Sequence, residues 1–400
     1  MENDVLTTAV AAALRTPVVW FMAVAAALGT ASIYPLQPAI AVVAGTLDSS
    51  RAEIGIALAC GPVGYLMGLA LLVPLVDRFS PRHVLSTQFA VLAIALAVSA
   101  WVGTPWLLGL AVGVIGAGSS VGAQLSSVAG RFAVPQRRAT VLGIVTAGIS
   151  AGILTGRIIG GWLTDVIGWR GTLLVFAIAC GAVAIAARVV LPAAAPSAAS
   201  GYLATLQALP GLYVRFVSLR LAAVRGALWF FAFCAVWAGL AVALSEPPFT
   251  YSSERIGLYA LAGLLGIIAT RIAGAWTDRV GARKVILLGL VIAVAAAAAL
   301  GAFLSNTAAT LVCLGLFDAG LFAAQVANQS TVLAIDPDAP ARFNSAYMLV
   351  YFIGGSLGTA FGAAAVEWFG WPTTTLVAAA AIASAAVITV AARIQSQPGI

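Results

Sequence analysis

Long runs without a charged residue constrain this chain more than any other feature. A helix that crosses a bilayer needs about 20 mainly apolar residues, and several of the uncharged runs hold one such span. Only 8% of the 400 residues are charged and 62% are hydrophobic, whereas a soluble domain carries roughly 25% charged residues. The sequence therefore predicts a chain whose main solvent is lipid. The uncharged runs are Thr16–Leu47, Ile54–Val76, Val84–Gly130, Gly226–Ser245, Val285–Phe317, Phe343–Val366 and Trp368–Ala392.

The spans are predicted to be helices. Only helices and closed barrels satisfy their backbone polar groups in lipid, and barrel strands alternate apolar and polar residues, which none of these runs does. The runs 84–130 and 285–317 approach or hold two spans each, with turn signals inside them. We predict an all-α membrane protein with twelve transmembrane helices. Their ranges are 17–43, 53–76, 84–102, 107–130, 139–163, 171–192, 219–245, 255–277, 284–304, 307–331, 343–366 and 372–393.

The distribution of Arg and Lys predicts the orientation. Basic residues gather in alternate loops, including 78–82, 131–138 and 279–284, while the opposite loops hold only Arg51, Arg170 and Arg255. Loops rich in Arg and Lys lie in the cytoplasm. We therefore expect a multi-pass protein of a bacterial inner (cytoplasmic) membrane with both termini cytoplasmic.

The two halves of the chain repeat each other. PLVDRFSPRH at 74–83 matches AWTDRVGARK at 275–284, an offset of 201 residues. Five positions match at an offset of 202: Gly152, Gly156, Gly160, Gly168 and Trp169 correspond to Gly354, Gly358, Gly362, Gly370 and Trp371, and Asp165 also corresponds to Glu367. The repeat predicts two pseudo-symmetric six-helix bundles, 1–192 and 219–400, joined by a cytoplasmic linker, 193–218, that is partly a surface-lying helix. Such duplications are typical of transporters with a substrate site between the halves.

These motifs resemble the major facilitator superfamily, in particular the twelve-helix drug:proton antiporters and the sugar-efflux-like branch. The loop after the second span is similar to the family's G-x-L-x-D-R-x-G-R-R motif, and the copy after the eighth span matches it better. The fifth span is similar to the antiporter motif G-x8-G-x3-G-P-x2-G-G, with Arg157 at the proline position. The fourth span departs from the family pattern, because Val112 stands where many antiporters carry an arginine. The motif's proton-relay role is therefore not carried over to the fourth span.

The resemblance implies roles for the two loop motifs and for the glycines. Asp77 and Asp278 are expected to approach the first turns of spans in the other half, near Arg342 and near Arg137 and Arg138, and to latch the cytoplasmic gate. A carboxylate at a helix N-terminus is favoured by about 0.3–1 kcal/mol; ordinary loop salt bridges, worth little, are the alternative. The gating set is Asp77, Arg78, Arg82, Asp278, Arg279, Arg283 and Arg342. The glycines Gly143, Gly152, Gly156, Gly160 and Gly161 are expected to bring the fifth span against the eighth.

Two charges stand inside apolar spans. Arg157 lies in the outer half of the fifth span, where it either reaches the outer surface or pairs within the bundle, or faces the central cavity and holds an anionic group or an acid. Asp318 in the tenth span lies near mid-bilayer, on a span that lines the cavity in this family. Because removal from water disfavours the charged carboxylate, we predict a proton-coupling or substrate role, with a structural hydrogen-bonded aspartate as the alternative.

The remaining cavity candidates are polar and aromatic residues of presumed lining spans. Each alone is typical of packing, and together they predict a mixed polar and aromatic pocket. They are Tyr34, Gln37, Gln124, Gln325, Asn328, Gln329, Trp237, Tyr347 and Tyr351, with Trp229, Phe230 and Phe233 as further aromatic residues of the seventh span.

The lead hypothesis is a secondary active transporter that moves a small organic molecule out as a proton moves in. A proton-independent facilitator or exchanger is the alternative, and a transport-dead receptor is a more distant one. An enzyme is not expected, because the chain has one histidine, no clustered cysteines and no acid pair. We predict no cofactor, no metal and no nucleic-acid partner, and a monomer in the bilayer.

Overall fold

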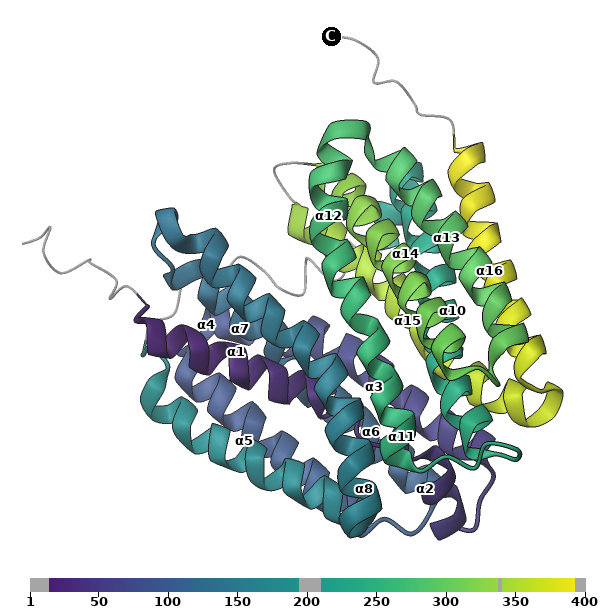
Figure 1. Cartoon of the computed structure of the whole chain (residues 1–400). Coiled ribbons are helices and arrows are strands. Elements are labelled where there is room, and N and C mark those ends of the chain that lie inside the picture. Colours follow the sequence, from purple (N-terminus) through teal and green to yellow (C-terminus); the bar gives the residue numbers. More distant parts are fainter. Residues whose placement is uncertain (1–13, 194–209, 337–339, 393–400) are drawn as a thin grey trace, which may run out of the picture.

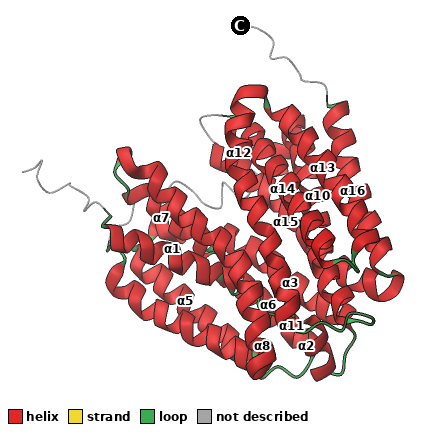
Figure 2. Ribbon diagram, viewed as in Figure 1, coloured by secondary structure: helices red, strands yellow, loops and turns green. Residues whose placement is uncertain are grey.

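The computed structural model describes residues 14–193, 210–336 and 340–392, and every regular element among them is a helix (Figure 2). The helices form two pseudo-symmetric six-helix bundles, which confirms the predicted fold class. The first bundle runs from purple to teal in Figure 1 and the second from green to yellow. Large apolar side chains such as Trp106, Ile178 and Val189 are 85%, 74% and 84% exposed, as expected of surfaces that face lipid.

The first bundle contains eight α-helices that make up six spans. They are α1 (Thr16–Ala31), α2 (Ile40–Thr46), α3 (Arg51–Leu71), α4 (Leu75–Arg78), α5 (Pro81–Ser99), α6 (Pro105–Gly118), α7 (Val121–Phe132) and α8 (Arg138–Val190), with a 3-10 turn η1 (Pro135–Arg137) before α8. The second bundle contains α10 (Val217–Ser245), α11 (Ser253–Leu258), the 3-10 turn η2 (Tyr259–Gly263), α12 (Leu264–Val280), α13 (Ala282–Phe303), α14 (Thr307–Leu333), α15 (Pro340–Phe369) and α16 (Trp371–Ala391).

Several spans are interrupted rather than continuous. The first consists of α1 and α2, separated by residues 32–39, where Pro35 and Pro38 cannot donate the backbone N–H bonds of a helix. The fourth consists of α6 and α7, and there Gln88 Nε2 donates to the carbonyl oxygen of Gly118 at 3.0 Å. Non-helical backbone at membrane depth persists only where protein or a cavity surrounds it, so both interruptions must be enclosed by the protein.

Two glycines turn the chain between spans at equivalent places in the halves. The single long helix α8 contains two spans, and it changes direction at Gly168, whose φ is 76°. Its repeat partner Gly370, with a φ of 81°, stands between α15 and α16. A residue without a Cβ adopts such angles readily, and the two turns therefore support the repeat found in the sequence.

The glycine motif of α8 mostly packs against α1, which corrects the expectation that it faces the eighth span. A Cβ added at Gly156 would lie 2.6 Å from the Ala31 carbonyl oxygen of α1, and Gly152 and Gly160 approach α1 and Pro35 as closely. Gly143 has no atom within 4 Å of that position. Only Gly161 meets the eighth span, at Ser253. In the second bundle Gly354, Gly358 and Gly362 pack in the same way on α10.

The halves are held together at the side away from the arginine-rich loops 78–82, 131–138 and 279–284, which we call the opposite side. There the backbone N–H groups of Ser253 and Glu254 donate to the Asp165 carboxylate at 3.1 and 2.8 Å. In the symmetric arrangement the N–H of Ala52 donates to Glu367 Oε2 at 2.7 Å. Each carboxylate thus caps the first turn of a helix in the other half, α11 or α3.

An ion pair strengthens the same side. Arg51 Nη1 lies 2.9 Å from Glu246 Oε1, and both side chains are about one-third exposed, at 34% and 31%. Close to this side, α3 of the first half packs against α15 of the second half, where a Cβ added at Gly55 would meet Ala363. Toward the arginine-rich side α8 and α12 diverge (Figure 1). The structure is therefore closed at the opposite side.

The predicted latch on the arginine-rich side is not engaged through Asp278. Its carboxylate is exposed and has no ion-pair or hydrogen-bond partner among the described residues. The structure does not describe the side chain of Asp77, so its contact with Arg342 stays a prediction. Arg283 donates to the Val390 carbonyl oxygen at 2.9 Å. The other gating residues are placed as follows: Arg279 is exposed, and Arg78, Arg82 and Arg342 are half-buried.

The predicted linker and termini lie partly outside the described residues. Within 193–218, residues 194–209 are not described, residues 210–215 are helical, and α10 begins at Val217. The extreme termini, 1–13 and 393–400, are not described either. The helix α1 begins and α16 ends toward the arginine-rich side (Figure 1). Placement of that side in the cytoplasm stays a prediction.

The corrected glycine contacts predict opposite effects at two positions of one motif. Gly156→Ala should lower the melting temperature of the purified protein in detergent, because overpacking costs about 1–3 kcal/mol. Gly143→Ala should leave it unchanged or raise it, because alanine favours a helix by up to about 1 kcal/mol. Equal melting temperatures for the two variants would contradict the packing on α1.

The two carboxylate caps predict that their joint removal opens the opposite side. Asp165→Ala combined with Glu367→Ala should lose about 2 kcal/mol of contact between the halves. Spin labels on Thr46→Cys and Thr373→Cys, with the native cysteines replaced by serine, should then show a new population at longer distance. Glu254→Ala is the control, because it removes an acid from the same helix end without removing a contact between the halves. An unchanged distance distribution in the double variant would argue against the caps as a latch.

Candidate functional site

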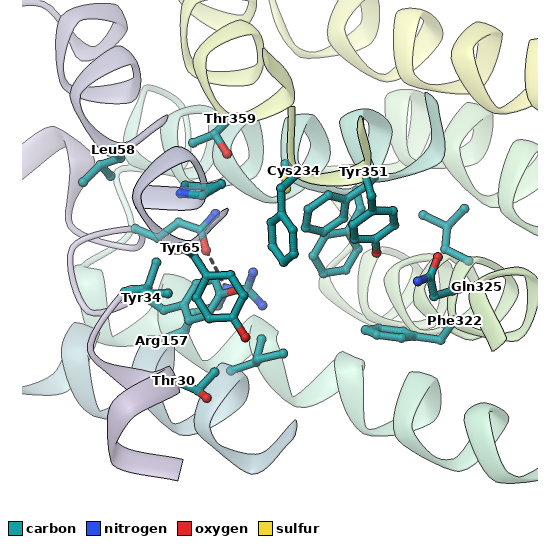
Figure 3. Close-up of a pocket in the computed structure, with 18 of the residues that line it drawn as sticks. Thr30, Tyr34, Leu58, Tyr65, Arg157, Cys234, Phe322, Gln325, Tyr351 and Thr359 are labelled. Carbon is teal, nitrogen blue, oxygen red and sulfur yellow. Dashed lines mark hydrogen bonds between the residues drawn. The ribbon is translucent and has the colours of Figure 1, made fainter. Parts of the chain in front are cut away.

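A cavity of about 230 Å³ lies between the two bundles (Figure 3). Its wall comes from six spans, three in each half, and includes the interrupted segment that follows α1. The residues predicted from the sequence that line it are Tyr34, Gln37, Arg157, Gln325, Tyr351, Trp229, Phe230 and Phe233. Lining residues that the sequence analysis did not single out include Thr30, Tyr65, Cys234, Phe322, Phe352 and Thr359.

Arg157 lies in the cavity wall and does not reach the outer surface. Its side chain is 4% exposed, and its Nε donates to Gln37 Oε1 at 2.5 Å. The guanidinium carbon lies 4.9 Å from the centre of the Tyr34 ring and 4.5 Å from that of Trp237. Because aromatic faces attract cations, these rings stabilise the charge in place of water. Arg157 therefore faces the cavity and is also paired within the bundle through Gln37, while the predicted reach to the outer surface is not seen.

Asp318 is buried behind the cavity wall, not in it. Its side chain is 2% exposed, and Oδ1 accepts a hydrogen bond from Trp237 Nε1 at 3.2 Å. A Cβ added at Gly263 would lie 3.2 Å from Oδ2, so Gly263 leaves room for the carboxylate beside η2. The expectation that Asp318 lines the cavity directly is therefore wrong in this structure. Trp237, which is also absent from the wall, connects Asp318 to Arg157.

Aromatic rings form the wall contributed by the second half. Phe230 and Tyr351 are stacked, with ring centres 4.0 Å apart and planes 10° from parallel. Phe322 meets Phe233 edge to face at 5.8 Å. Tyr65 of the first half reaches Phe352 at 4.9 Å. This wall presents flat, apolar faces with a few polar groups at their edges.

Gln325 is held in the wall by two donors. Its Oε1 accepts from Trp229 Nε1 at 3.3 Å and from the Tyr347 hydroxyl. Because the carbonyl oxygen is engaged, the amide nitrogen is the group of Gln325 that is left for an occupant. Tyr347 itself is buried beside Gly226 and does not line the cavity.

Three predicted amide residues lie away from the cavity, which corrects the sequence analysis. Gln124 is fully buried on α7 and donates to the Leu72 carbonyl oxygen at 2.6 Å. Asn328 donates to the Ala222 carbonyl oxygen at 3.0 Å, and Gln329 donates to Asn344 at 2.8 Å. These side chains join neighbouring helices. The span of Asn328 and Gln329 lines the cavity in part, but their positions on α14 turn them toward other helices, and the fourth span, which carries Gln124, does not line the cavity.

The described residues contain no group of three His, Cys, Asp or Glu side chains placed to hold a metal ion. Cys234 lines the cavity as a free thiol. Tyr65 and Phe352 carry no sequence signal beyond an apolar span, so only the packing of α3 on α15 reveals them.

Known proteins that this chain resembles are transporters. It is 29% identical over 358 residues to the uncharacterized transporter YgaY of Escherichia coli O157:H7, covering 90% of this chain and 91% of that protein. It is 30% identical over 360 residues to the protein named "Probable transporter SCO4007" of Streptomyces coelicolor, covering 90% of this chain and 84% of that protein.

Solved structures share the fold. The nucleoside transporter NupG superposes with a TM-score of 0.76 at 15% identity, over 93% of this chain and 99% of that one. A bacterial homolog of the human lysosomal transporter Spinster, in an inward-facing and occupied conformation, superposes with a TM-score of 0.75 at 14% identity, over 94% and 96%.

Two six-helix bundles around a central cavity, together with these relatives, define a membrane transporter. The sequence profile of the Major Facilitator Superfamily matches residues 19–253 and 228–399. The chain belongs to the Major Facilitator Superfamily.

The bond from Trp237 to Asp318 predicts a loss of stability when its donor is removed. Trp237→Phe keeps a ring beside Arg157 but leaves the buried carboxylate without its hydrogen bond, which costs about 1–3 kcal/mol. The melting temperature in detergent should fall accordingly. Trp106→Phe, at a site 85% exposed, should leave it unchanged. A Trp237→Phe protein as stable as the parent would show that the bond contributes nothing.

Proposed function

We propose that this chain is a proton-coupled secondary transporter that moves a small organic molecule by alternating access. The observation that carries the proposal is the connection Arg157–Trp237–Asp318, which joins the cavity to a buried carboxyl group. A charge so far from water needs a partner or a proton. A carboxyl group in contact with the cavity through one side chain can therefore exchange a proton in step with substrate binding.

The contacts between the halves support alternating access. Asp165, Glu367 and the Arg51–Glu246 pair hold the opposite side closed. With the arginine-rich side in the cytoplasm, as the loop charges predict, the cavity lies on the cytoplasmic side of that closure. The fifth span resembles the antiporter motif, and this resemblance favours export of the molecule in exchange for a proton. Such an exchange requires that the protein cannot hold the substrate and a proton on Asp318 at the same time.

A proton-independent facilitator or exchanger is the second candidate. The position of Asp318 behind the wall favours it, because a substrate in the cavity does not touch that carboxylate. The uncharged fourth span also favours it, since Val112 supplies no relay group. In this reading Asp318 serves only to fix α14 to α10 through Trp237.

Asp318→Asn separates the two candidates. The variant keeps a hydrogen-bond acceptor for Trp237 but cannot ionise, so transport in proteoliposomes should lose its dependence on an imposed pH gradient while exchange of substrate across the membrane continues. The transported compound is the strongest binder found by thermal shift in a panel of neutral, cationic and anionic molecules. Glu254→Gln serves as the control, because that acid is exposed on the opposite side.

Two results would overturn the proton role of Asp318. One is an Asp318→Asn protein whose flux responds to the pH gradient as the parent does. The other is a parent protein whose concentrative transport is unaffected when the gradient is collapsed, which would favour the facilitator.

A further inference from the structure

The buried charges of the described residues do not balance. Three charged side chains are buried: Arg157, Arg225 and Asp318. Asp318 can neutralise at most one of the two arginines. Because an unpaired charge away from water is costly, the centre of the protein is left with an excess positive charge that an anionic occupant would neutralise.

Arg157 is available to such an occupant. Gln37 is its one described hydrogen-bond partner, through Nε, and no described carboxylate lies within ion-pair distance. Asp318 acts on Arg157 electrostatically, but its own hydrogen bond goes to Trp237. In Figure 3 the end of the Arg157 side chain points toward the open part of the cavity beside Tyr34. A guanidinium held by one edge can bind a carboxylate with its other N–H groups.

Arg225 supplies a second cation on the approach from the arginine-rich side. It lies one turn before Trp229 on the same face of α10. Its side chain is 8% exposed, and its Nε has no hydrogen-bond partner among the residues that the structure describes. Tyr347, which lies beside the neighbouring Gly226, donates to Gln325 of the cavity wall. Arg225 therefore lies on the arginine-rich side of Trp229, outside the cavity wall itself.

The shape of the cavity restricts the organic group to which the anionic group of a ligand is attached. The stacked Phe230 and Tyr351 present a flat face, and Phe322 and Phe233 form an edge beside it. The cavity holds about 230 Å³, whereas sites for drug-sized ligands are about 300–1,000 Å³. A compact, flat ring fits this wall better than a long flexible chain.

Resting on the proposed function, we propose that the cavity takes a small organic monoanion, a carboxylate on a flat aromatic ring, with Arg157 as the residue that selects its charge. The carboxylate binds at Arg157 and Gln37, and the ring lies against Phe230 and Tyr351. Arg225 attracts the anion on its way in.

An anionic substrate determines the sign of the coupling. When Asp318 is ionised, its negative charge weakens the attraction between Arg157 and a bound anion. When Asp318 is protonated, it carries no charge and this attraction is at full strength. The other polar groups near this pair, Tyr34 and Cys234, carry no charge at neutral pH in their ordinary forms. Proton and anion therefore bind together, and the carrier moves them in the same direction. Exchange of the substrate for a proton, which the sequence resemblance favours, does not fit an anion at this site.

The test is calorimetric binding to the purified full-length protein in detergent, with three probes of one shape: 2-naphthoate, 2-naphthamide and 2-naphthylmethylamine. We expect naphthoate to bind about 10- to 100-fold more tightly than the amide, the range that hydrogen bonds to a charged group provide, and the amine to bind most weakly. Cyclohexanecarboxylate, an anion without a flat ring, should bind less tightly than naphthoate. Equal affinity for naphthoate and its amide would overturn the proposed charge selection. Equal affinity for the two carboxylates would overturn the aromatic part.

Variants identify the residue that selects charge. Arg157→Gln should abolish the preference for naphthoate, and Arg157→Lys should keep part of it. Arg215→Gln, which removes an exposed arginine outside the cavity, should keep all of it. A melting temperature measured on each sample excludes unfolding as the cause. If Arg157→Gln does not fold, Arg157→Lys serves as the test instead. If the folded variant prefers naphthoate over the amide as strongly as the parent does, Arg157 does not select the charge.

The pH dependence of binding separates this inference from the proposed function. Naphthoate should bind more tightly to the parent at about pH 6 than at about pH 8, and Asp318→Asn should remove that difference. Weaker binding at the lower pH would overturn joint loading of proton and anion and restore exchange. If naphthoate binds as expected but no flux in proteoliposomes follows, the transporter proposal fails while the ligand class stands.

Discussion

The cost of an unpaired charge away from water governs the centre of this molecule. Arg157 replaces water with one amide oxygen from Gln37 and the faces of Tyr34 and Trp237. Each of these partners is uncharged, so the positive charge is tolerated without being cancelled. A true ion pair with Asp318 would cancel it and leave little for a substrate. By accepting from Trp237 instead, Asp318 remains close enough to influence Arg157 and far enough to leave it available.

The interrupted first span makes this arrangement possible. A continuous helix across residues 32–39 would keep every backbone group paired within itself, as lipid requires. Pro35 and Pro38 prevent it, and the chain instead presents Tyr34 and Gln37 to Arg157. The glycines of α8 then let the two segments approach, since Gly160 lies directly against Pro35. One local feature of the backbone therefore supplies both the polar contact and the space for it.

The sequence predicts the architecture well because lipid leaves the backbone few choices. Uncharged runs of sufficient length must be helices, and the repeat at offsets of 201 and 202 residues requires two similar halves. It predicts the faces of those helices poorly. Gln124 and Asn328 lie on helices whose polar residues could meet either a neighbouring helix or the cavity, so the sequence pattern does not distinguish the two. The glycine motif likewise predicts a close approach but not its partner, because α1 and α11 both lie beside α8. Arg225 escaped notice because it stands near the end of a span, where an arginine is ordinary.

The repeat also explains how one side can open without unfolding. Ser50 and Ser252 cap α3 and α11, and the acid of the other half completes each cap, Glu367 for the first and Asp165 for the second. Because each half contributes one helix end and one carboxylate, a rotation that breaks one contact also breaks its symmetric partner. The serine caps stay within their own halves, so both helices remain capped when the halves part. On the arginine-rich side Asp278 is exposed and free of partners among the described residues. Because the two contacts break together, a carrier of the proposed kind would pass between two states rather than through a continuum between them.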